Sequence, residues 1–185
     1  MENNNIETEL KFLLLEFPEL FLNKFNGSGK RVYQKTVMFD NKQELMQKTN
    51  GRIRLRQDDD ITTLSYKLPI PSDTVKKEIE WETKIDNWQV GEELLKAMGF
   101  EESTSYEKYR TSFRYKDSKI EVDEYPFANF VEIEGDEDSV KKIALDLGFD
   151  LAKALIKPCD TLFNEWRAKK GLLSTNKMFF SNYDK

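Results

Sequence analysis

Like charges occupy alternate positions in three short stretches of the sequence, with apolar residues between them. The stretches are ETELK at 7–11, RIRLR at 52–56 and EIE at 132–134. In a β-strand, residues two apart lie on the same face, so each stretch would place its charges on one side of a sheet. Like charges held in this way repel one another unless opposite charges lie nearby. The pattern therefore favours a sheet whose charged face binds a metal ion and a polyanion, and phosphate chemistry is the leading interpretation.

The remaining sequence has the same alternation in further segments that are rich in β-branched and aromatic residues. Strands are predicted over residues 6–14, 32–40, 51–57, 61–68, 77–85, 105–115, 119–125 and 130–134. Helices are predicted over 19–25, 43–46, 88–98 and 139–147, followed by a C-terminal helical tail over 151–185 whose part after Gly171 is expected to be loosely ordered. Because the helices follow no strict βαβ rhythm, we expect an antiparallel sheet or barrel in an α+β fold. We expect a single domain over residues 1–185.

The signs of the charges are segregated strand by strand. A sheet with one solvated face explains any single strand of this kind, since such sheets are common. Across seven strands, a closed sheet explains the segregation better, with its charged face inward and helices packed on its apolar outside. Like charges buried in such a lumen are unfavourable on their own. A divalent cation on the carboxylates and a polyphosphate on the basic side chains would offset them.

Composition excludes several other classes of function. The chain has 185 residues and a net charge of −5, so it lacks the basic surface that general nucleic-acid binding requires. It has no histidine and one cysteine, Cys159, which excludes Ser-His and Cys-His catalysis, a cysteine-based zinc site and an intrachain disulfide. Its N-terminus lacks a basic signal-peptide region, and the apolar run at 12–15 is too short to span a bilayer, so we expect a cytoplasmic protein with no membrane partner.

Three tryptophans and the cysteine have plainer interpretations than ligand binding. Trp81 falls on the apolar face of its strand and is predicted to lie in the core. Trp88 and Trp166 lie in predicted helices and are also expected to be packing residues. Cys159 follows a proline at a predicted helix start, where a lowered pKa is an alternative to a plain buried or half-exposed thiol. We favour the plain thiol.

The charged motifs follow one another in a characteristic order. They are Glu-x-Glu-x-Lys at 7–11, Arg-x-Arg at 52–54, Lys67, Lys-x-Arg at 108–110, Asp123 and Glu-x-Glu at 132–134. This series, over about residues 6–150, resembles the CYTH superfamily, the triphosphate tunnel metalloenzymes, which include class IV adenylate cyclases, thiamine triphosphatases and inorganic triphosphatases. The segment at 123–130 lacks the Leu-Gly turn associated with cyclase members.

The resemblance implies an eight-stranded antiparallel β-barrel, a tunnel that holds a triphosphate end-on. It implies metal ligands at Glu7, Glu9, Asp123, Glu132 and Glu134, with Glu80 as a further candidate. It implies phosphate contacts from Lys11, Arg52, Arg54, Lys67, Lys108 and Arg110. The residue types agree with these roles, because carboxylates suit the hard cations Mg²⁺ and Mn²⁺, and arginine and lysine bind phosphate. A late lysine completes the site in some thiamine triphosphatases, and the candidates here are Lys153, Lys157, Lys169 and Lys170.

The sequence favours a metal-dependent phosphohydrolase that acts on a triphosphate-containing small molecule. A carboxylate of the Glu132/Glu134 pair would accept the proton of the attacking water, and Lys67 would be the leaving-group acid. The alternative enzyme is a class IV adenylate cyclase, in which the ribose 3′-hydroxyl of ATP attacks instead. A non-catalytic binder of polyphosphate or nucleotides ranks last, because the sequence contains all the candidate carboxylates. The sequence favours no particular oligomeric state.

Overall fold

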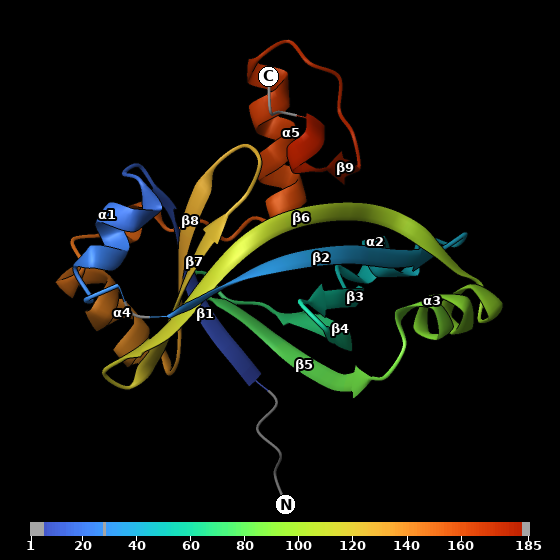
Figure 1. Cartoon of the computed structure of the whole chain (residues 1–185), viewed down its shortest axis with the longest axis horizontal. Coiled ribbons are helices and arrows are strands. Elements are labelled where there is room, and N and C mark those ends of the chain that lie inside the picture. The colour runs from blue at the N-terminus through green and yellow to red at the C-terminus, as the bar shows by residue number, and fades with distance from the viewer. Residues whose placement is uncertain (1–5, 28, 183–185) are drawn as a thin grey trace, which may run out of the picture.

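Eight antiparallel strands close into a barrel in the computed structural model, which describes residues 6–27 and 29–182 (Figure 1). Neighbouring strands pair in the order β2-β3-β4-β5-β1-β8-β7-β6, and β6 pairs back onto β2. The strands are β1 (Ile6–Leu14), β2 (Lys30–Asn41), β3 (Arg52–Asp58), β4 (Ile61–Ile70), β5 (Lys76–Ile85), β6 (Phe100–Tyr115), β7 (Ser118–Glu124) and β8 (Asn129–Glu134). The predicted eight-stranded antiparallel barrel in an α+β fold is therefore confirmed.

The main hydrophobic core lies outside the barrel, between its strands and the helices. Apolar residues that alternate with the charged ones, such as Leu10, Val122 and Ile133, pack there against Val140 and Ile143. The last two belong to α4 (Glu137–Asp146), which Asp136 caps by accepting a hydrogen bond from the backbone N–H of Ser139. The other helices are α1 (Pro18–Asn23), α2 (Leu45–Thr49), α3 (Trp88–Ala97) and α5 (Cys159–Lys169). Because these apolar positions face outward, the charged positions that alternate with them on β1, β7 and β8 face inward.

The C-terminal segment is folded onto the barrel, contrary to two predictions. In the described part of the helical tail predicted over 151–185, the helical elements are a 3₁₀ turn at Leu151–Lys153, α5, and a second 3₁₀ turn at Phe180–Asn182. The part after Gly171, predicted to be loosely ordered, forms β9 (Lys177–Met178), which pairs in parallel with β6. Met178 is buried with Phe163 of α5. The propensities of single residues gave no sign of this pairing, because it depends on a partner strand about seventy residues away.

The prediction for Trp81 was wrong, because this side chain is 48% exposed. It does lie on the apolar face of β5, where it stacks on Tyr66 with ring centroids 5.7 Å apart. Trp81 lines an open apolar groove beside Met46 of α2 and Leu95 of α3, but these helices pack mainly on β2, β3 and β6 and leave it half-exposed. The sequence thus correctly predicted the face of the strand on which Trp81 lies, but it did not predict that the side chain stays half-exposed there. Trp88 and Trp166 are packing residues, as predicted.

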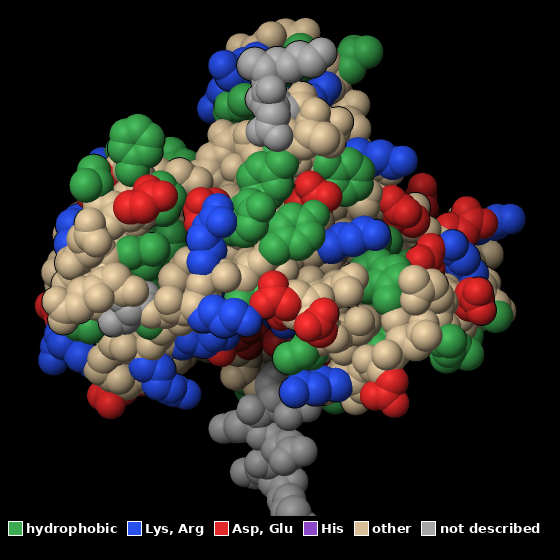
Figure 2. All heavy atoms as spheres, viewed as in Figure 1, with side chains coloured by type: hydrophobic (Ala, Val, Ile, Leu, Met, Phe, Trp, Pro, Cys, Tyr) green, Lys and Arg blue, Asp and Glu red, His purple; other side chains and the backbone are tan. Residues whose placement is uncertain are grey.

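On the face shown in Figure 2, acidic and basic side chains are intermingled, and a group of hydrophobic side chains lies near its centre. Within residues 6–27 and 29–182, none of the helices has the length and apolar character needed to cross a bilayer.

Candidate functional site

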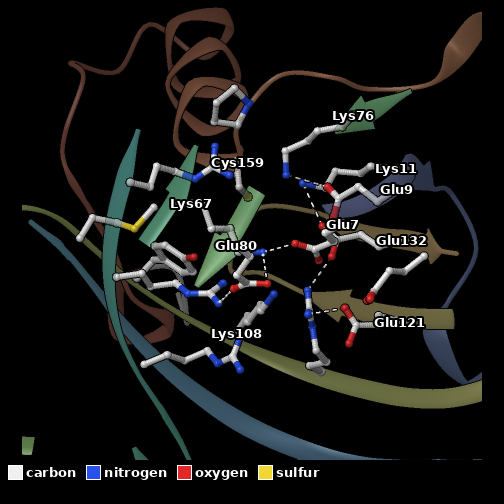
Figure 3. Close-up of a pocket in the computed structure, with 18 of the residues that line it drawn as sticks. Glu7, Glu9, Lys11, Lys67, Lys76, Glu80, Lys108, Glu121, Glu132 and Cys159 are labelled. Carbon is white, nitrogen blue, oxygen red and sulfur yellow. Dashed lines mark hydrogen bonds and ion pairs between the residues drawn. The ribbon is translucent and has the colours of Figure 1, made fainter. Parts of the chain in front are cut away.

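A charged cavity of about 180 Å³ lies inside the barrel, and side chains from all eight strands line it (Figure 3). Among the described residues, nine Lys or Arg and eight Asp or Glu contribute to its wall. The predicted site residues that line it are Glu7, Glu9, Lys11, Arg52, Arg54, Lys67, Glu80, Lys108, Arg110, Glu132 and Glu134. Residues spread over more than 120 positions of sequence are thus brought together by the closure of the sheet, as the alternation predicted.

One group of ion pairs joins β1, β4 and β5. Lys67 contacts Glu7 and lies 3.1 Å from Glu80, and the Nζ of Lys76 lies 2.8 Å from Oε1 of Glu9. Burial raises the pKa of Glu7; Lys67 opposes this shift, and the nearby carboxylate of Glu9 adds to it. The carboxylates in this part of the cavity are therefore crowded, and each depends on a lysine for compensation.

A second group of ion pairs centres on Arg110 of β6. Its guanidinium contacts Glu121, donates bonds of 2.6 and 2.5 Å to Asp123, and lies 2.6 Å from Glu132. The other side of Glu132 is held by Lys11, at 2.9 Å. Burial alone would raise the pKa of Glu121, but Arg110 and the neighbouring lysine outweigh it and lower that pKa to about 2. Burial is likewise outweighed at Glu132, where Lys11 and Arg110 hold the pKa well below its usual range.

Asp123 differs from the other predicted metal ligands in its position. Its side chain is fully buried and is not among the residues that line the cavity. Its carboxylate accepts hydrogen bonds from Lys108, at 2.7 Å, and from Arg110. In this structure Asp123 holds two of the predicted phosphate-binding side chains from behind. Its role as a metal ligand stays a prediction.

The arginines of β3 reach the carboxylates of β5 across the barrel wall. Arg54 donates to Glu80 and Glu82, both at 3.1 Å, and to the hydroxyl of Ser65, also at 3.1 Å. Arg52 contacts Glu78, which is buried below the cavity surface. The cationic row of β3 is thus fixed by the row of glutamates that the sequence places on β5.

The cavity also contains residues that were missing from the predicted site. Lys76 was missed because its strand was predicted to begin at residue 77, although its spacing of two residues from Glu78 was a usable signal. Lys119 and Glu121 were missed because the resemblance assigns them no role. The remaining additions are Met38, Arg56, Glu82, Thr104, Tyr106, Tyr125, Pro158, Cys159 and Asp160.

The four late lysines proposed as candidates are not among the residues that line this described cavity. Lys153 lies 3.9 Å from Asp150, and Lys157 lies 2.5 Å from Glu165. The start of α5 reaches the cavity instead, and Cys159 belongs to its wall. Burial raises the pKa of the Cys159 thiol to about 12, which agrees with the plain thiol that we favoured.

The donors in the cavity fit a hard divalent cation by their chemistry. Carboxylate oxygens are the ligands that Mg²⁺ and Mn²⁺ prefer. The strand register places Glu9 directly opposite Glu134, and like charges so placed destabilise a sheet unless a positive charge compensates them. Within the described residues, no three acidic or thiol side chains converge as an ion's ligands; Glu9 contacts Lys76, and Glu134 contacts Lys119. The carboxylates therefore suit a hard cation by the chemistry of their oxygens.

Comparison with known proteins identifies the family. The model of the CYTH domain matches residues 5–154, so the chain belongs to the CYTH family. A comparison with curated proteins found no match.

Three solved structures show the same fold at low sequence identity. A protein of Vibrio parahaemolyticus named as a candidate adenylate cyclase is 18% identical, with a TM-score of 0.72 over 86% of this chain and 98% of that one. A protein of Pyrococcus horikoshii is 24% identical, with a TM-score of 0.69 over 86% and 98%. A Hippeastrum protein, named as a candidate adenylyl cyclase and described as having a dominant triphosphatase activity, is 19% identical, with a TM-score of 0.64 over 91% and 96%. At these identities, the likeness establishes the fold and leaves the reaction to be argued from the site.

Proposed function

We propose that this protein is a metal-dependent hydrolase of a triphosphate, either inorganic triphosphate or an organic or nucleoside triphosphate. The observation that carries the proposal is one cavity in which basic side chains from β1, β3, β4, β5, β6 and β7 converge. The nine basic side chains exceed the eight acidic ones by only one charge, so the described cavity wall is almost neutral. A triphosphate carries several negative charges, and cations bound on the carboxylates would supply the balance. The site therefore suits a triphosphate together with its metal ion.

The basic side chains would bind and orient the phosphate chain. Arg52 and Arg54 offer planar guanidinium groups that match two phosphate oxygens at once, whereas Lys67 and Lys108 act as point charges. Lys11, Lys76 and Arg110 line the same cavity and also belong to this set. Held in place by the closed barrel, these groups would neutralise the charge that develops on the transferred phosphoryl group in a loose transition state.

The carboxylates proposed to hold Mg²⁺ or Mn²⁺ are Glu7, Glu9, Glu132 and Glu134, with Asp123 behind them and Glu80 beside them. When bound, the ion would polarise the terminal phosphoryl group and orient the attacking water. The protein's own groups then handle the protons. Lys67, at the centre of one group of ion pairs, is the proposed acid for the leaving group.

Glu134 is the better of the two proposed proton acceptors. The pKa of Glu132 is held well below its usual range by Lys11 and Arg110, so this carboxylate is a weak base. Glu134 has a looser contact, with the Nζ of Lys119 3.2 Å away, and its side chain is one-third exposed. It lines the same cavity as the phosphate-binding row. We therefore assign the water's proton to Glu134 and an electrostatic role to Glu132.

A class IV adenylate cyclase is the second candidate, and one feature of the cavity favours it. Met38 and Tyr106 line the cavity beside the β3 arginines and would offer an apolar surface to an adenine ring. A cyclase must also aim the ribose 3′-hydroxyl at the α-phosphorus, which demands in-line geometry. The hydrolase needs only the phosphate contacts, and it remains the first proposal.

A panel of inorganic triphosphate, ATP and thiamine triphosphate, each with Mg²⁺ or Mn²⁺, tests the proposal. Chromatography should show phosphate released from inorganic triphosphate at least as fast as from ATP, and no cyclic AMP. A cyclic AMP peak that is lost in Glu134→Gln would establish the cyclase. Binding of these compounds without turnover in either metal would establish the non-catalytic binder.

A further inference from the structure

Glu78 is an acidic residue of β5 that lies behind the wall of the cavity. Its side chain is 2% exposed, and it is not among the residues that line the cavity, whereas Lys76 and Glu80 on either side of it are. One carboxylate oxygen contacts the guanidinium of Arg52, and the other lies 3.0 Å from the Nζ of Lys76. Glu78 therefore joins two basic side chains of the cavity from a position that a ligand in the cavity does not reach.

The strand register makes a carboxylate at this position costly. Glu78 lies directly opposite Glu7 of β1, and like charges that face each other across a strand pair destabilise the sheet. A buried carboxylate also loses its hydration, which only close opposite charges offset. A glutamine would fill the same volume without this cost. Packing alone therefore does not explain why the residue at this position carries a charge.

The charge of Glu78 restricts the side-chain conformations of Arg52 and Lys76. Both side chains are long. If nothing held them in the cavity, each would lose rotamer entropy on binding an anion. Glu78 holds one nitrogen of each in place. The guanidinium of Arg52 keeps further N–H groups for a ligand, because an arginine carries five. Lys76 also contacts Glu9, so Glu78 anchors it between the metal-ligand candidates and the arginine row.

We propose that Glu78 is a positioning residue that holds Arg52 and Lys76 in the orientation in which they bind the phosphate chain. This inference rests on the proposed function, since it assumes that a triphosphate enters the cavity. Glu78 touches no substrate. Its effect on binding is exerted through the two basic side chains, which contact the bound chain in the ground state and in the transition state alike.

The test compares Glu78→Gln with wild type by calorimetric binding of inorganic triphosphate, with and without Mg²⁺, and by steady-state kinetics. Loss of two ordered contacts should raise Kd and KM by about tenfold, and kcat should change by less than about threefold. The matched control is Glu137→Gln. Glu137 also contacts two lysines, Lys77 at 2.6 Å and Lys141 at 2.6 Å, but on the outside of the barrel. The Kd and KM of Glu137→Gln should equal those of wild type.

A double-mutant cycle separates positioning from a general effect on the fold. In an Arg52→Gln background, Glu78→Gln should raise KM by much less than it does alone, because one of its two targets is already absent. Should Glu78→Gln fail to fold, Glu78→Asp keeps the charge but shortens its reach, and KM should still rise by about threefold or more. An unchanged KM and Kd in a folded Gln or Asp variant, or full additivity in the cycle, would overturn the inference. Absence of binding and turnover in wild type would instead overturn the proposed function.

Discussion

Removal of the Arg110 guanidinium should destabilise the protein strongly at neutral pH. Arg110 is the shared partner of Glu121, Asp123 and Glu132, and its side chain is 13% exposed. In Arg110→Met, each of these buried carboxylates keeps one lysine partner, and Glu121 also keeps the hydroxyl of Ser112. Removing one member of a buried ion pair costs about 3–5 kcal/mol, because the other charge is left buried and uncompensated. For a chain of this length, each kcal/mol corresponds to about 2–4 °C, so the melting temperature should fall by about 6–20 °C.

The destabilisation should shrink as the pH falls. In wild type, the pKa of Glu121 is lowered from 4.5 to about 2, because Arg110 and Lys119 outweigh burial. This shift contributes stability that is present above pH 4.5 and is lost as the pH falls toward 2. In Arg110→Met, the main influence that lowers this pKa is removed while burial remains, so we expect the pKa of Glu121 to lie higher than in wild type and less of this stability to be lost as the pH falls. The free-energy difference between the two proteins should therefore narrow below about pH 4.5.

Urea unfolding at pH 7 and pH 3.5, in EDTA so that no metal contributes, measures both effects. The control is Arg31→Met on the neighbouring strand. Arg31 also makes a two-bonded ion pair, with Glu124 at 2.7 and 2.9 Å, but its side chain is 51% exposed. The change Arg31→Met should lower the free energy of unfolding by less than about 1 kcal/mol. Equal costs for the two variants, or a cost for Arg110→Met that does not change with pH, would refute this account of the buried network.

Three further predictions follow from positions in the barrel. Glu9→Gln or Glu134→Gln should abolish triphosphate turnover with an unchanged circular dichroism spectrum, and activity that survives both changes or excess chelator would contradict the metal site. Trp81→Ala should cost about 1–2 kcal/mol in urea unfolding, against about 3–5 for the buried Phe130→Ala, because half of Trp81 is already in water; equal costs would mean that Trp81 is covered in solution. The Cys159 thiol, whose pKa burial raises to about 12, should resist iodoacetamide at pH 8 in the folded protein and react in urea, as followed by mass spectrometry, and rapid native labelling would show that the thiol is open to solvent.

The face of each charged residue was predictable, because alternation in a strand is a strict geometric rule. Arg52, Arg54 and Lys67 were assigned to one side of a sheet, and the structure places them on the wall of one cavity. Closure was predictable for a related reason, since rows of buried like charge are tolerable only where rows of opposite charge face them. The inward side of these charged positions was therefore predictable from the spacing of charges along the chain, whereas uncharged lining residues such as Met38 and Tyr106 were not.

The sequence did not predict which residues of an inward strand face line the cavity and which lie buried behind its wall. Glu78 and Glu80 share one face of β5, yet Glu78 lies behind the cavity wall and Glu80 lines it. Asp123 has the parity of a lining residue and is fully buried beneath Arg110. Depth depends on barrel curvature and on the reach of neighbouring side chains, and neither is expressed in the period of the sequence. The same limit applies to Trp81, whose exposure depends on where helices from other parts of the chain pack.

The strand register explains how rows of like charge become both a stable barrel and a binding site. It places Lys11 opposite Glu132, and Lys67 opposite Glu80, so these pairs neutralise one another without help. Elsewhere it places like charges together, and two of these pairs are Glu9 opposite Glu134 and Arg52 opposite Lys67. At these two places the sheet itself supplies repulsion, which a cation relieves at the carboxylates and a polyanion relieves at the basic pair. Binding of both would thus remove a cost that the fold already carries, which is why the same alternation that specifies the barrel also specifies its proposed ligands.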